Sequence, residues 1–62
     1  MSLQKLAEEL ENLKVEYEKF ERGNNAAGTR ARKILQNIKK ICQEMRIQIQ
    51  DARKKENQQQ QQ

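Results

Sequence analysis

The sequence predicts an all-α fold, an antiparallel two-helix hairpin that is coiled-coil-like and dimerises into a helical bundle. Three observations predict it. Strong helix formers dominate the 62 residues, and the chain has no proline. Apolar residues recur at alternating steps of three and four along the first third of the chain. The only two glycines lie close together, in one short segment that interrupts this pattern.

The first helix is expected over residues 2–22. Ser2 can cap its N-terminus. The helix should end near Gly23, because glycine readily adopts the left-handed conformation that commonly closes a helix. The two aromatic residues lie on the apolar seam, so we expect them to pack in the core near the turn. The seam has the spacing of heptad a and d positions and consists of Leu3, Leu6, Leu10, Leu13, Tyr17 and Phe20.

A turn is expected over residues 23–25 and a second helix over residues 25–55. Asn24 or Asn25 can cap this helix by accepting a hydrogen bond from a free backbone N–H. So short a connection places consecutive helices antiparallel and adjacent. The apolar stripe is wider than a strict a/d seam, and a wide stripe faces more than one neighbour. Its members are Ala27, Ala31, Ile34, Leu35, Ile38, Ile41, Cys42, Met45, Ile49 and Ala52.

The second helix is longer than the first by roughly ten residues, or about 15 Å. The first helix cannot cover its far end, so we expect a homodimer that closes a four-helix bundle. Cys42 should behave as a small buried hydrophobe, and a single cysteine excludes an intramolecular disulfide. Residues 56–62, with the sequence ENQQQQQ, are polar and of low complexity, so we expect a disordered Gln-rich tail.

Several function classes are excluded by what the sequence lacks. Without histidine and with one cysteine, the chain cannot supply a zinc site. No pair of acids, histidine base or activated nucleophile points to catalysis, so we expect no enzyme, no catalytic residue, no metal and no cofactor. No small-molecule substrate is expected either. No apolar run reaches the roughly 18 to 20 residues that span a membrane, and no signal peptide is visible, so we expect a cytoplasmic protein.

The segment from Gly23 to Thr29 has the spacing G-x-x-x-x-G-T, close to that of a nucleotide-binding loop. That loop requires a lysine after its second glycine and a preceding strand. Gly28 is followed by Thr29 and the preceding segment is helical, so a nucleotide loop is excluded. Gly28 instead allows close approach, either of the first helix through Phe20 or Tyr17 or of a nucleic-acid backbone.

The charge is unevenly distributed. Residues 1–22 hold four Lys/Arg and six acids, a net charge of −2, whereas residues 23–62 hold nine Lys/Arg and three acids, a net charge of +6. In the second helix the cations form two rows at seven-residue spacing, facing away from the apolar stripe. The first row is Arg32, Lys39, Arg46 and Arg53, and the second is Lys33, Lys40 and Lys54. Two such rows suit a polyphosphate backbone.

A helix N-terminus also attracts phosphate, and the start of the second helix carries further donors. Asn24, Asn25 and Thr29 offer neutral donors beside Arg30 and Arg32. The candidate DNA-binding residues are therefore Asn24, Asn25, Thr29, Arg30, Arg32, Lys33, Lys39, Lys40, Arg46, Arg53 and Lys54. No arrangement of base-reading side chains is evident, so little sequence specificity is expected.

The segment FERGNNAAGTRARKILQNIKK, followed by EMRIQIQDARK, resembles the bacterial histone H1-like nucleoid proteins. The resemblance covers about residues 13–55. It implies a DNA-binding, chromosome-compacting, nucleoid-associated protein without enzymatic activity. Longer family members carry a Lys/Ala-rich tail where this chain has glutamines, so we expect the helices to be the binding element. The matching signature is Gly23, Asn24, Ala26, Ala27, Gly28, Thr29, Arg30, Arg32 and Lys33.

Two other functions fit the sequence. A coiled-coil module for protein–protein interaction would use the a/d seam, and its basic rows would then serve only solubility. A basic amphipathic helix could also lie on an anionic membrane, although the stripe suits bundle packing better. Double-stranded DNA and a second copy of the chain are the partners we expect. The order of the oligomer and the choice between DNA and RNA stay open.

Overall fold

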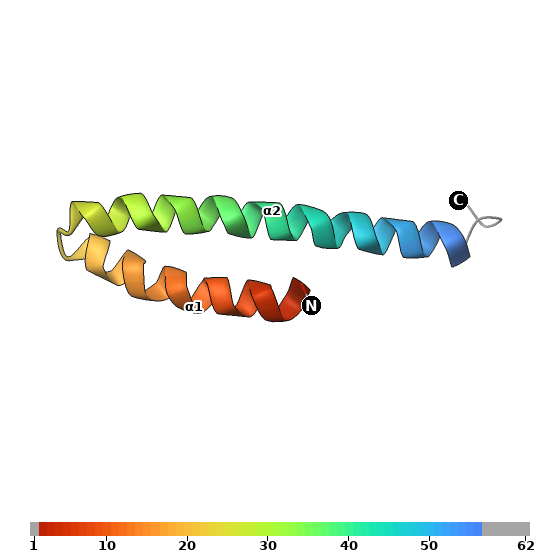
Figure 1. The fold of residues 1–62 in the computed structure, drawn as a ribbon, viewed down its shortest axis with the longest axis horizontal. Coiled ribbons are helices and arrows are strands. Elements are labelled where there is room, and N and C mark those ends of the chain that lie inside the picture. Colours follow the sequence, from red (N-terminus) through yellow and green to blue (C-terminus); the bar gives the residue numbers. More distant parts are fainter. Residues whose placement is uncertain (1, 57–62) are drawn as a thin grey trace.

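The computed structural model describes residues 2–56, which form two helices joined by a tight turn (Figure 1). Helix α1 spans Ser2–Glu21 and helix α2 spans Asn25–Glu56. The helices run antiparallel and pack against each other, so the all-α hairpin expected from the sequence is confirmed. Dimerisation involves a second chain and stays a prediction. The Gln-rich tail lies outside the described residues, apart from Glu56, which ends α2.

The turn is built by backbone hydrogen bonds around Gly23. Its N–H donates to the Phe20 carbonyl at 2.9 Å, and the Asn24 N–H donates to the Lys19 carbonyl at 3.0 Å. This pair of bonds defines a Schellman motif, which requires a left-handed residue just past the helix. Gly23 fills that position with a φ of 104°. The reversal of the chain therefore depends on a glycine at this one place.

The register of the two helices is set next to the turn, where the ring of Phe20 lies on Gly28. A Cβ on Gly28 would come within 2.7 Å of Cδ1 of Phe20, so only glycine allows this approach. Both helices rise about 1.5 Å per residue, so Leu10 lies roughly opposite Ile38. By the same count α1 begins roughly opposite residue 46. The last ten residues or so of α2 extend beyond α1 (Figure 1).

The core between the helices is thin. Among the described residues only Ala27, Ala31 and Ile41 are buried. Two of the three are alanines close to the turn, where small side chains bring the helices near each other. Around them lies a half-buried layer that includes the carboxylate-bearing Glu9 and Glu16. Its apolar members are Leu6, Leu13, Ile34, Ile38 and Met45.

Three sequence expectations about burial are wrong. Tyr17 and Phe20 do not fill the core, because 45% and 42% of their surfaces are exposed, although their rings pack at 5.8 Å. Cys42 is exposed instead of buried. The reason is angular: Cys42 is one residue past the buried Ile41 and so points about 100° away from it around the helix.

Candidate nucleic-acid interface

The two basic rows lie on the side of α2 that is turned away from α1, which we call the outer face. Side chains that contact α1 recur from Ala27 to Met45 at steps of three and four, and this pattern fixes the inward direction. At 100° per residue, the two rows lie on either side of the line that points directly away from α1. Every member is exposed: Arg32, Lys39, Arg46 and Arg53 in the first row, and Lys33, Lys40 and Lys54 in the second.

A line of neutral amides separates the two rows. Gln36, Gln43 and Gln50 recur every seven residues and are all exposed. The guanidinium Nη1 of Arg46 donates to Oε1 of Gln43 at 3.2 Å, so the amides can orient the cations beside them. Lys39 and Lys40, one from each row, share a shallow hollow of about 480 Å³ with Gln36, Gln43 and the acidic Glu44. Sequence reasoning missed these glutamines, although their seven-residue spacing matches that of the lysines.

The second row is interrupted. Its seven-residue spacing passes through position 47, where Ile47 stands between Lys40 and Lys54 with 46% of its surface exposed. The first row has no such gap and extends from Arg32 to Arg53, about 30 Å along the helix. The outer face is therefore a continuous row of four cations beside a broken row of three.

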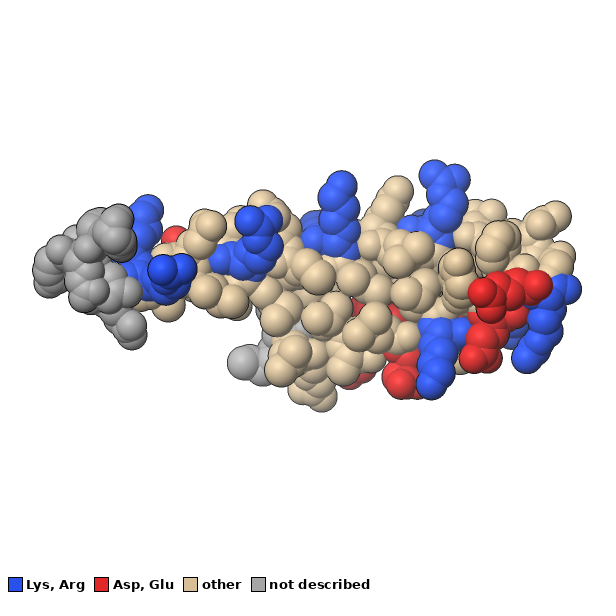
Figure 2. Space-filling model, turned by 180° about the vertical axis from the view of Figure 1, so that it is seen from behind, with Lys and Arg blue, Asp and Glu red and all other residues tan. Residues whose placement is uncertain are grey.

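Glu44 and Asp51 lie beside the second row, and Glu44 reaches the hollow shared by Lys39 and Lys40. Glu44 and Asp51 fall in line with Asn37, on a flank nearer to α1. Glu44 there lines a hollow together with Lys5 and Glu9 of α1. Figure 2 shows the result on one face: Lys and Arg project at intervals along α2, whereas most Asp and Glu lie over α1 with Lys and Arg among them. The charge bias inferred from the sequence is thus also a bias in space, with the excess of cations on α2.

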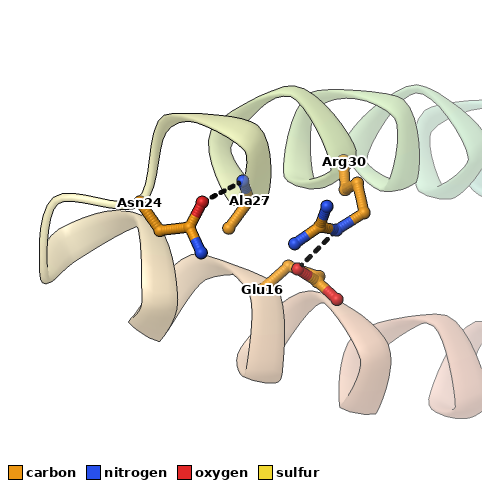
Figure 3. A network of polar contacts seen from close by, with 4 residues as sticks. All are labelled: Glu16, Asn24, Ala27 and Arg30. Carbon is orange, nitrogen blue, oxygen red and sulfur yellow. Dashed lines mark hydrogen bonds and ion pairs between the residues drawn. The ribbon is translucent and has the colours of Figure 1, made fainter.

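Arg30 lies apart from the other candidate cations. Its Nε donates to Oε1 of Glu16 at 2.9 Å, which joins α2 to α1 (Figure 3). The Glu16 side chain is only 19% exposed and that of Arg30 is 51% exposed. Arg30 therefore points along the side of the hairpin, and its charge is already balanced. This contact depends on the register of the two helices and could not be read from either helix alone.

The start of α2 is capped from within. Oδ1 of Asn24 accepts a hydrogen bond from the Ala27 N–H at 3.0 Å, so Asn24 is the capping residue (Figure 3). Its side-chain oxygen is thereby used. Asn25 and Thr29 are exposed and lie near Arg32, where the three line one hollow. The ring of Phe20 lies against Gly28. Of the two roles expected for this glycine, close approach of α1 or of a nucleic-acid backbone, the structure therefore supports the approach of α1.

Two features of the described residues concern other kinds of site. No three His, Cys, Asp or Glu side chains come together there as a group that could hold a metal ion. Neither of its helices is long and apolar enough to cross a membrane. What the described residues do offer is a long, exposed cationic surface.

Comparison with known proteins agrees with the sequence resemblance. A family model described as histone H1-like protein Hc1 matches residues 1–55, which include all of α1 and nearly all of α2. No curated protein matches the chain, and no solved structure does. The resemblance identified from the turn segment is thereby confirmed.

Proposed function

The chain belongs to the histone H1-like protein Hc1 family, and from this membership we propose that it binds duplex DNA through its phosphates, with little preference for sequence. Membership of the family implies a DNA-binding nucleoid protein. The proposal adds how the DNA is bound and by which residues. It also adds that binding helps to organise or compact the chromosome.

One observation carries the proposal: the outer face of α2 presents seven exposed cations, and the one acid that reaches it, Glu44, lies at the edge of the second row. Duplex DNA carries about one negative charge per 1.7 Å, so the roughly 30 Å of this face runs past on the order of 18 phosphate charges. Although many of these phosphates lie on the far side of the duplex, the face meets phosphates whatever its register along the DNA. Such an arrangement gives affinity without reading the bases.

The glutamines between the rows fit the same role. Their amide N–H groups can donate to phosphate oxygens, as polar side chains commonly do in protein–DNA contacts. They also keep the cations of the two rows apart, which lowers repulsion on the free helix. The proposed contacts are Asn25, Thr29, Arg32, Lys33, Lys39, Lys40, Arg46, Arg53 and Lys54, with weaker parts for Asn24 and Arg30, whose polar groups already have partners.

Self-association belongs to the proposal, because one hairpin offers a single outer face. A dimer would carry two such faces and could bend one DNA segment across both. Compaction of this kind needs no basic tail beyond the helices. It follows from bending of the DNA, and its extent should increase with the concentration of the dimer.

Charge reversal tests the proposed surface. Arg32→Glu combined with Lys39→Glu removes two phosphate contacts and adds two repulsions, so affinity for a mixed-sequence duplex should fall on the order of a hundredfold at low salt. The matched control is Lys14→Glu combined with Lys19→Glu on α1, which changes the net charge equally but lies away from the outer face. We expect the control to lose only a few-fold. Fluorescence anisotropy gives the affinity, and circular dichroism checks the helices.

The comparison between the two variants decides the outcome. Equal losses would mean that net charge, and not the outer face, governs binding. Unchanged affinity in both, or no binding by the native chain at moderate salt, would favour the coiled-coil protein–protein module instead. Parallel measurements with single-stranded DNA and RNA test the expected choice of duplex.

A further inference from the structure

The hairpin exposes an apolar face along one of its sides. This face consists of Leu3, Leu10 and Tyr17 on α1 and of Leu35, Cys42 and Ile49 on α2, each set at seven-residue spacing. The two sets lie on the same side of the hairpin, since Tyr17 and Leu35 line one hollow. All six side chains are exposed, and the five large ones are exposed by 45% to 67%.

This exposed apolar face matters because the hairpin has a very small core of its own. Only three described residues are buried, and none of the described large side chains is fully buried. Small domains of this length are marginal even with a well-packed core. A partner that covers the apolar face would supply the missing burial, and the shape of the face indicates which partner fits.

The two ends of the apolar face are complementary. Near the turn, Tyr17, Phe20, Gly28 and Leu35 line a hollow of about 260 Å³ whose walls are mainly apolar. It is the same hollow that Asn25, Thr29 and Arg32 border on the side of the outer face. At the other end Ile49 lies on the part of α2 that extends beyond the start of α1, with 58% of its surface exposed. One end thus offers a concave apolar site and the other a protruding apolar side chain. A second copy in the opposite orientation brings each end against the other.

The spacing of the residues supports one register. On α2 the apolar set continues to Gly28, and its midpoint from Gly28 to Ile49 falls between Leu35 and Cys42. On α1 the midpoint is Leu10, which lies roughly opposite Ile38. The two midpoints agree to within about one residue, or 1.5 Å. A single two-fold axis can therefore superpose both sets on themselves, as an isologous interface requires.

We propose that a second copy of this chain covers the apolar face in antiparallel orientation, α1 on α1 and α2 on α2, so that Ile49 of each copy enters the hollow beside Gly28 of the other. This rests on the self-association included in the proposed function and not on DNA binding. Leu10 lies at the two-fold axis and faces its own symmetry mate. Leu35 of one copy faces Cys42 of the other.

This arrangement also relates dimerisation to the outer face. The row from Arg32 to Arg53 borders the apolar face on α2. In the dimer the two copies of this row run side by side along one edge, with Lys39 near its own mate. Like charges repel there unless salt or phosphate screens them. Self-association should therefore strengthen as salt rises, which is opposite to the salt dependence of DNA binding.

Cysteine cross-linking in the full chain, without DNA, tests the register. Leu35→Cys leaves the native Cys42 in place, and mild oxidation should give disulfide-linked dimers in high yield. Leu10→Cys combined with Cys42→Ser should do the same through a single bond at the axis. The native chain should stay largely unlinked, because Cys42 and its mate lie about 10 Å apart along the helices, beyond disulfide reach. An intramolecular bond between positions 35 and 42 is excluded for the same reason.

The controls separate register from random collision. Gln43→Cys combined with Cys42→Ser carries its thiol on the outer face and should cross-link no faster than random collision at the same concentration.

Sedimentation tests the dimer itself. Ile49→Asp should shift the chain toward the monomer, whereas Gln50→Asp should not. Circular dichroism should show that both variants stay helical. Rapid linking of the native chain through Cys42 would overturn the antiparallel register. A folded monomer at high micromolar concentration would overturn the dimer while leaving the charge-reversal test of DNA binding intact.

Discussion

Gly23 is the residue on which the hairpin depends most directly. Its φ of 104° lies in a region that side chains with a Cβ rarely adopt, and nothing lies within 4 Å of the position where a Cβ would stand. The demand for glycine is therefore conformational and not steric. The Schellman bonds around it end α1 and direct the chain into the cap formed by Asn24.

Gly23→Ala should lower the free energy of unfolding by about 1 to 2 kcal/mol, the cost of a left-handed conformation for a residue with a Cβ. Gly23→Asn should cost less, because asparagine tolerates that conformation better. Urea unfolding followed by circular dichroism measures both. If alanine were as stable as glycine, the turn in solution would differ from the one described.

Gly28, the second glycine, is required for close packing and not for its backbone conformation. It lies inside α2, where glycine is unfavourable by about 1 kcal/mol relative to alanine. The ring of Phe20 occupies the space that a side chain would need. The same glycine lines the hollow proposed to receive a side chain of a second copy. Two glycines that look alike in the sequence thus differ, one serving backbone conformation and the other close packing.

At the scale of the helix, α2 has three functional directions. One contacts α1, one carries the apolar residues Leu35, Cys42 and Ile49, and the outer face carries the cations. The outer face has one defect, since Ile47 stands where the second row would hold a lysine. That defect allows a test by gain of function.

Ile47→Lys should complete the second row and tighten duplex binding. One added phosphate contact should also steepen the plot of log K against log salt by about 0.9. The matched control is Val15→Lys on α1, which adds the same charge to another exposed aliphatic position. Equal gains from both substitutions would show that position on the outer face does not matter.

The sequence was sufficient to predict the two helices and the face of α2 on which the cations lie, because both follow from periodicity along a single helix. It was not sufficient for burial. On α1 the seam contains two rows, and only the one with Leu6 and Leu13 turns toward α2, while Leu3, Leu10 and Tyr17 stay exposed. Heptad spacing leaves this choice open because the two rows lie only about 50° apart.

The contact between Arg30 and Glu16 shows a second limit. Fourteen residues separate the two positions, and no local pattern joins them. Only the register set by Phe20 and Gly28 brings them together, so Arg30 looked like any other cation in the sequence. Contacts between elements of this kind need the fold before they can be assigned.

At the scale of the whole molecule, the hairpin separates three properties on different surfaces. Most acids lie on α1, apolar side chains lie along one side, and cations line the outer face of α2 (Figure 2). With a net charge of +4, the chain is only moderately basic. Its affinity for DNA therefore has to come from the placement of the cations on one surface and not from their number. The central claim is that this arrangement binds the DNA backbone.

The salt dependence of duplex binding tests that claim most directly. If each protomer neutralises about five phosphates, log K should fall with log salt at a slope near −4 to −5 per protomer. Arg32→Gln combined with Lys39→Gln should reduce the magnitude of that slope by about 2, for duplexes of unrelated sequence alike. A slope near zero for the native chain, or one that the two substitutions leave unchanged, would contradict it.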